Sequence, residues 1–146
     1  MAFMSCKTKP VDCKPFDTLD IKENCIIYFT LSEGDQGDFE RINQNFAISD
    51  KLEIQKIKQN WGLYKTDKRM PCGYGYVVFI TQNDKLVKEI DINEPCGYAI
   101  ISDEWYDFDN SFFDIIDTSR IERLNMQQAD SIQKVFFKQS NERYGK

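Results

Sequence analysis

Hydrophobic and polar positions fall into short alternating or continuous runs at the centre of this chain. Residues 75–81 and 86–92 are two β-rich runs around the polar break 82–85, a pattern that predicts a β-hairpin. Residues 25–31 form a continuous apolar run, which is typical of a strand buried on both faces in the middle of a sheet. Residues 98–101 predict a further strand.

Helical spacing of apolar residues predicts three to four helices outside the hairpin. One follows Asp38, a second begins at Asp50 and ends at Gly62, a short third begins at Asp109 or Asn110, and the last begins near Asn125. Asp50 and Glu53 have the spacing of a capping box, which favours a helix start at that point. Together these elements predict an α+β domain. Its mostly antiparallel sheet contains a disulfide-stapled hairpin, and its three to four helices pack on one face.

The predicted staple comes from the phrase Pro-Cys-Gly-Tyr, which occurs at both ends of the hairpin, at 71–74 and 95–98. A register centred on Asp84 places Cys72 opposite Cys96. Directly opposed residues of an antiparallel pair have Cβ atoms roughly 4.5–5.5 Å apart, which is close to disulfide geometry. The sequence therefore predicts a Cys72–Cys96 disulfide.

The other cysteines extend this interpretation. Cys13 and Cys25 are the next natural pair, joining the N-terminal segment to the first strong strand, and Cys6 is left over. Two bridges would be typical of a protein in an oxidising compartment. The alternative is a cytoplasmic protein with five reduced thiols, several of them buried as small apolar groups.

Residues 3–7, Phe-Met-Ser-Cys-Lys, resemble the processing site of bacterial lipoproteins, in which a small residue precedes the cysteine that is lipidated. The resemblance implies a lipid anchor at Cys6 and a location in the periplasm or at the outer membrane. The charged start and the apolar core of a signal peptide do not precede these residues, so an ordinary N-terminal segment is the alternative. We expect residues 1–15 to form a flexible tether and residues 16–146 a single globular domain.

Charge and composition exclude several functions. The net charge of −5 argues against generic nucleic-acid binding, which needs clustered Lys and Arg. Histidine is absent, and it is both the usual general base and the commonest transition-metal ligand. Asp107, Asp109 and Ser111 have the spacing of the start of a calcium loop, but Phe112 and Thr118 stand where that loop needs Gly and Glu. We therefore predict no catalytic residue, no metal and no cofactor.

The run from 103 to 117 holds six acidic and five aromatic residues and no basic one. This composition suits a partner-binding surface, because aromatic rings supply contact area and carboxylates attract a basic partner. The predicted partner-binding residues are Asp103, Glu104, Trp105, Tyr106, Asp107 and Asp109. The alternative places Trp105, Phe108, Phe112 and Phe113 in the core and leaves the acids merely solvated.

Tyrosines at the ends of the hairpin form a second candidate site. Tyr74, Tyr76 and Tyr98 would cluster beside the predicted bridge, where they could stack on a sugar. In the alternative interpretation they pack over the disulfide as part of the core.

These features lead to one leading functional expectation and two alternatives. A small, acidic, histidine-free, stapled domain is similar in build to immunity and inhibitor proteins, which occlude the active site of a toxin or cell-wall hydrolase. We expect a non-enzymatic cell-envelope protein with a basic protein partner, no nucleic-acid partner and membrane attachment only through Cys6. The alternatives are a carbohydrate- or small-ligand-binding envelope lipoprotein and a carboxylate-based hydrolase.

Overall fold

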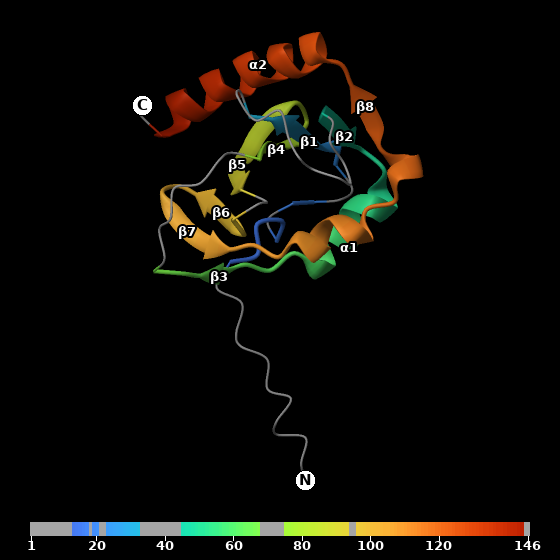
Figure 1. The fold of residues 1–146 in the computed structure, drawn as a ribbon. Coiled ribbons are helices and arrows are strands. Elements are labelled where there is room, and N and C mark those ends of the chain that lie inside the picture. Colours follow the sequence, from blue (N-terminus) through green and yellow to red (C-terminus); the bar gives the residue numbers. More distant parts are fainter. Residues whose placement is uncertain are drawn as a thin grey trace.

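An antiparallel sheet organises the described part of the chain, which in this computed structural model comprises residues 13–17, 19–20, 23–32, 45–67, 75–93 and 96–144 (Figure 1). Its eight strands are β1 (Cys25–Leu31), β2 (Asn45–Ile48), β3 (Tyr64–Lys65), β4 (Tyr76–Gln82), β5 (Lys85–Asn93), β6 (Tyr98–Ile101), β7 (Glu104–Asp107) and β8 (Glu122–Leu124). They lie in the order β3-β7-β6-β5-β4-β1-β2-β8. The α-helices in this part of the chain are α1 (Lys51–Asn60) and α2 (Met126–Tyr144).

The central hairpin is confirmed as strands β4 and β5. Asn83 and Asp84 form its two-residue turn with φ of 52° and 64°, a left-handed conformation that Asn and Asp tolerate better than most residues. The register shifts once, between Ile80 and Thr81. Beyond this bulge the partners are symmetric about Asp84, as predicted, with Val78 opposite Ile90.

The predicted disulfide staple is not supported. The β4–β5 ladder can be followed among the described residues as far as Tyr76 and Ile92, and residues 71–74 and 94–95, through which it would have to continue to the two cysteines, lie outside them. Cys96 is not a free thiol, but Cys72 lies outside the described residues and no disulfide joins two described residues. The described residues therefore contain neither a disulfide-stapled hairpin nor a ladder that reaches both cysteines.

The predicted Cys13–Cys25 bridge is wrong, because both residues are free thiols. Cys13 instead joins the sheet through its backbone, which pairs with Leu63 in an isolated antiparallel bridge. The Cys25 thiol donates a hydrogen bond to the carbonyl oxygen of Asp20 at 3.2 Å. Burial, together with the nearby carboxylate of Asp20, raises the pKa of this thiol above its usual value. Cys6 lies outside the described residues.

The number and placement of the helices also differ from the prediction. The sequence placed Phe46 in the helix that follows Asp38. In the structure residues 45–48 form strand β2 instead, and residues 33–44 lie outside the described part of the chain. All four residues of β2 are buried because it lies between β1 and β8, and Phe46 stacks on Phe29 with ring centroids 4.6 Å apart. The segment Asn110–Ile115 is a 3-10 helix rather than an α-helix. Two α-helices rather than three or four are therefore present among the described residues.

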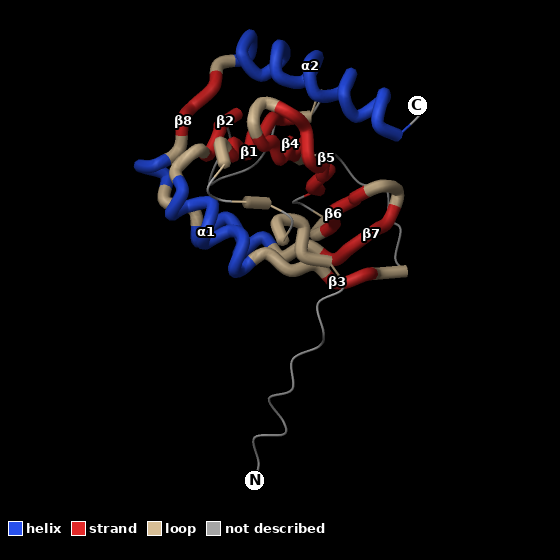
Figure 2. The backbone as a smooth tube through the Cα atoms, turned by 180° about the vertical axis from the view of Figure 1, so that it is seen from behind, coloured by secondary structure: helices blue, strands red, loops and turns tan. Residues whose placement is uncertain are grey.

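The two α-helices pack on opposite faces of the sheet, not on one (Figures 1 and 2). On the inner face, Ile54 and Ile57 of α1 join the main core with the rings of Phe29 and Tyr76. On the outer face, Phe136 of α2 packs in a smaller cluster formed by Val77, Phe79 and Leu86. Successive residues of a strand point to opposite faces, so one sheet with apolar residues at successive positions of β4 can support both layers.

The starts of both α-helices follow the sequence prediction. The Asp50 carboxylate accepts hydrogen bonds from the backbone N–H groups of Leu52 and Glu53, at 2.9 and 3.1 Å. Asn125 and Gln128 cap α2 reciprocally, each side-chain oxygen accepting from the other residue's backbone N–H at 2.8 Å. These caps satisfy N–H groups that have no partner inside the helix. The predicted capping box of α1 is only half formed, because the Glu53 carboxylate accepts the backbone N–H of Asp117 and not that of Asp50. No helix in the described ranges is long and apolar enough to cross a membrane.

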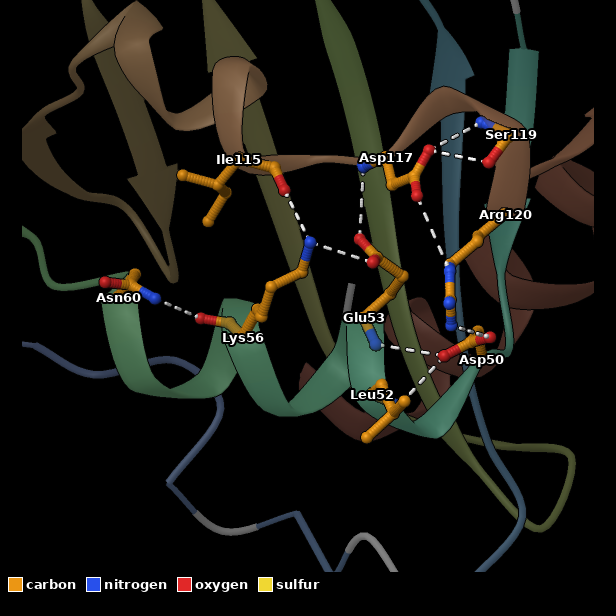
Figure 3. Close-up of polar contacts among 9 residues, drawn as sticks. All are labelled: Asp50, Leu52, Glu53, Lys56, Asn60, Ile115, Asp117, Ser119 and Arg120. Atoms are coloured by element: carbon orange, nitrogen blue, oxygen red, sulfur yellow. Dashed lines mark hydrogen bonds and ion pairs between the residues drawn. The ribbon is translucent and has the colours of Figure 1, made fainter.

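A polar network ties α1 to the segment that follows the 3-10 helix (Figure 3). The buried carboxylate of Glu53 lies 2.8 Å from the Lys56 ammonium group and accepts the backbone N–H of Asp117 at 3.1 Å. Lys56 also donates to the carbonyl oxygen of Ile115 at 3.0 Å. Each charge of the Glu53–Lys56 pair thus has a further hydrogen bond, which offsets part of the cost of burying Glu53.

Candidate binding surface

Strand alternation divides the acidic-aromatic run between the two faces of the sheet. In β7, Tyr106 lies opposite Ala99 and belongs to the inner core, where it is 7% exposed. Trp105 lies opposite Ile100 on the outer face and is half-buried. Two neighbouring aromatic residues are therefore separated into a core side chain and an accessible one.

Four side chains of β3, β6 and β7 share the outer face around Trp105. They are Tyr64, Tyr98, Ile100 and Trp105, and we refer to them as the outer patch. Tyr98 is nearly buried, and its ring meets that of Trp105 at 72° with centroids 5.5 Å apart. The other three remain half-buried. Rings in this edge-to-face arrangement form a preorganised apolar surface.

The strands that carry the outer patch, β3, β6 and β7, lie farther from α2 than β1, β4 and β5 do (Figure 1). The helix α2 packs on β1 and β4 through Phe136. Its ring centroid lies 5.5 Å from that of Tyr28 on β1 and 5.5 Å from that of Phe79 on β4. Gln139 also accepts the backbone N–H of Leu86, at the start of β5. The strands β6, β7 and β3 continue the sheet beyond β5, so their outer face extends past these contacts.

Carboxylates adjoin the outer patch on the same face. Asp107 is exposed and lies opposite both Tyr98 and Tyr64 in the two ladders that β7 makes. On β5, Asp91 is opposite Ile100, which places it on the outer face as well. An apolar centre with acidic neighbours is the arrangement expected of a surface that receives a basic partner.

The other predicted partner-binding residues occupy different places. Asp103 belongs to the tight turn between β6 and β7, with φ of 66°, and is exposed. Glu104 is exposed at the start of β7 but points to the inner-face side, since it lies opposite Ile101. Asp109 is exposed beyond the end of β7. All four of these acidic residues are exposed, but only Asp107 lies opposite residues of the outer patch in the sheet.

The predicted tyrosine cluster is not assembled at a surface. Tyr76 is 1% exposed and lies in the inner core, whereas Tyr98 is on the opposite face. Tyr74 lies outside the described residues. Phe108, Phe112 and Phe113 also belong to the inner core, as the alternative interpretation of the acidic-aromatic run expected.

Sequence reasoning missed Tyr64 and Ile100 as members of the surface. Tyr64 is brought beside β7 by pairing with Asp107, far along the chain, and no local pattern signals that contact. Ile100 could have been found from alternation, because it is the outward residue between the inward Ala99 and Ile101.

No described group of three or more His, Cys, Asp or Glu side chains is arranged to hold a metal ion. The comparisons with known proteins are equally negative: no protein-family model, no curated protein and no solved structure matches this chain.

Proposed function

We propose that this protein is a non-enzymatic binding domain that docks a basic protein partner on the outer patch and acts as an inhibitor of immunity-protein type. The single observation that carries the proposal is the position of Trp105. Its half-buried ring is held against Tyr98 on the part of the outer face beyond β5, next to the exposed Asp107.

The physical argument rests on what such a surface offers a partner. A half-buried indole can bury its remaining area on contact without first losing much freedom, and Trp and Tyr are enriched among residues that dominate binding energy. The Asp107 and Asp91 carboxylates favour approach of a positively charged surface and disfavour an acidic one. An inhibitor with this surface would cover a basic active site rather than perform chemistry itself.

The location of the protein remains part of the proposal. Lipid attachment at Cys6 and an envelope location rest on the resemblance of residues 3–7 to a lipoprotein processing site. Neither predicted bridge is found between described residues, because Cys13 and Cys25 are free thiols and Cys72 lies outside the described part, so disulfides no longer support the choice of an oxidising compartment. The binding surface does not depend on the location, because none of its side chains is a cysteine.

Affinity capture with matched variants tests the proposal. The full chain, Trp105→Ala and Leu52→Ala would each be used to retain proteins from envelope and secreted extracts. Leu52 is a suitable control because it is 67% exposed on α1, on the other face of the sheet. We expect a basic protein that wild type and Leu52→Ala retain and that Trp105→Ala loses, with hydrogen exchange slowed in β6 and β7 of the complex.

Retention that is unaffected by Trp105→Ala, with slowed exchange elsewhere, would show that the outer patch is not the docking surface. Turnover of a substrate by the purified chain would contradict the non-enzymatic part of the proposal.

A further inference from the structure

The outer face of the sheet has a ridge beside an uncovered strip. The ridge is α2, which packs on β1, β4 and the start of β5 (Figures 1 and 2). The strip consists of β6, β7 and β3, which carry the outer patch and which neither α-helix of the described residues covers on this face. Strands lie about 4.8 Å apart, so the strip is about 14 Å wide, which is enough for one helix about 10–12 Å across.

Two lysines lie on the side of α2 that faces away from the sheet. Phe136 is buried against β1 and β4, and Lys134 and Lys138 are each two residues from it, which places them on about the opposite side of the helix. Both are exposed, and neither side chain has an ion pair or hydrogen bond in the described part of the chain. Val135, next to Lys134, is 52% exposed. The outward side of α2 therefore presents two unpaired cations and an apolar side chain.

The strip and its border carry the opposite charge. Asp107 of β7 is exposed, and Asp91 of β5 adjoins the strip on the same face. The chain as a whole shows the same division. Residues 120–146 contain six basic and three acidic residues, a net charge of +3, so with a total of −5 the rest of the chain carries −8. The ridge and the strip are thus complementary in shape and in charge, and they lie side by side on one face.

We propose that two copies of this chain associate face to face, with the α2 of each copy lying on the strip of the other. A ridge beside a matching strip is what a two-fold symmetric contact requires, because the same surface must serve both copies. Lys134 and Lys138 of one copy then meet Asp107 and Asp91 of the other, and α2 covers the half-buried ring of Trp105. A head-to-tail contact would instead leave one ridge and one strip open and would continue into larger assemblies.

Self-association deepens the proposed function, because the dimer covers the outer patch and so excludes the basic protein partner. Only this exclusion rests on the proposed function, whereas the contact between two copies does not. We expect a dissociation constant of the dimer on the order of 10 μM. The copies are then separate at the nanomolar concentrations at which partner binding is measured.

Sedimentation velocity of the purified full chain tests self-association. Between about 1 and 300 μM, we expect a reversible shift from monomer to dimer and no larger species. Salt at about 1 M should weaken the dimer at least about threefold, because ion pairs between exposed side chains are screened. Trp105→Ala should weaken it at least about tenfold, since the ring is covered twice in the dimer.

A charge exchange between two variants identifies the surfaces that meet. Lys138→Glu and Asp107→Lys should each raise the dimer dissociation constant at least about tenfold, because each repulsion occurs twice in a two-fold dimer. An equimolar mixture of the two variants should return to within about threefold of the wild-type value. In the mixed dimer the substituted helix lies on the substituted strip, and the unchanged helix lies on the unchanged strip. Recovery would also show that both variants are folded.

Lys51→Glu, at an exposed lysine of α1, makes the same change in net charge and is the control. A chain that stays monomeric up to about 300 μM, equal dimer stability in Lys138→Glu and Lys51→Glu, or a mixture without recovery would overturn the proposal. Growth beyond the dimer would also overturn it, since a two-fold contact closes.

The two proposals fail separately, because the sedimentation experiments contain no partner. Retention of a basic protein through Trp105 would stand even if the chain were always monomeric. A dimer with the expected charge exchange would stand even if no partner were retained.

Discussion

The ring of Trp105 meets that of Tyr98 edge to face, with centroids 5.5 Å apart, across the β6–β7 ladder. One residue further along β7, Tyr106 points through the sheet into the inner core. The two neighbours therefore serve different purposes. Trp105 belongs to a surface that can contact a partner, and Tyr106 helps to hold the strand that presents it.

This division predicts unequal effects on stability for two adjacent substitutions. Tyr106→Ala should lower the free energy of unfolding by about 3–5 kcal/mol, because it empties a closely packed part of the core. Trp105→Ala should cost about 1 kcal/mol, mainly through the lost ring contact with Tyr98. Urea unfolding followed by circular dichroism measures both values. Equal losses, or a larger loss for Trp105→Ala, would mean that the faces have been assigned wrongly.

Charge reversal at Asp107 should slow association with the captured basic partner. Asp107→Lys is expected to lower the association rate about three- to tenfold at low salt, since it replaces attraction by repulsion at the outer patch. The effect should shrink as salt is raised, because exposed charges are screened. Asp130→Lys makes the same change in net charge on α2 and is the control. Surface plasmon resonance at several salt concentrations gives the rates, and identical rates for the two variants would remove Asp107 from the interface.

The buried carboxylate of Glu53 should be important for stability, since it connects α1 to residues 115–117 (Figure 3). Glu53→Gln should lower the free energy of unfolding by about 1–3 kcal/mol, because the Lys56 ammonium group loses its ion-pair partner. Glu142→Gln, at an exposed acid of α2, should change it by less than about 0.5 kcal/mol. Chemical unfolding of both variants is the measurement. Equally small losses of unfolding free energy in Glu53→Gln and Glu142→Gln would indicate that the Glu53 network does not couple α1 to residues 115–117.

Stability should decline in acid through the carboxylates of Asp50 and Asp117. The backbone N–H of Glu53 lowers the pKa of Asp50 below its usual value of 3.8, and the Ser119 hydroxyl lowers that of Asp117. A carboxyl with a lowered pKa in the folded state stabilises the protein above its unfolded pKa, and this contribution is lost as pH falls through the folded pKa. The free energy of unfolding should therefore fall from about pH 4 downward.

Asp50→Asn separates this titration from the helix cap. Asn is also a good N-cap residue, so α1 should keep its start while the titrating group is removed. We expect a shallower fall of the unfolding free energy below about pH 4 in Asp50→Asn than in wild type. Unfolding curves at a series of pH values provide the comparison, and parallel curves would show that Asp50 contributes nothing to acid sensitivity.

Elements whose conformation is set by residues close together in the sequence were predictable. The β4–β5 hairpin follows from two β-rich runs around a turn that tolerates left-handed backbone, and the helix starts follow from Asp50 and Asn125, whose side chains accept N–H groups of the first helical turn. The strand at Asn45–Ile48 was not predictable in the same way. Phe46 fits helical spacing with Phe39 and Ile42, but its place between β1 and β8 decides its conformation.

The sequence by itself determined a hairpin-centred antiparallel sheet, the starts of α1 and α2, and an unusually acidic and aromatic run after β6, but it predicted more helices than the two that the described residues form. Only the tertiary structure decided which residues of that run are accessible. The fold pairs β3 with β7, places α2 over β1 and β4, and directs Trp105 and Tyr106 to opposite faces. Those outcomes depend on contacts between segments far apart in the chain, and a local pattern of hydrophobic and polar residues carries no information about which distant segment will cover it.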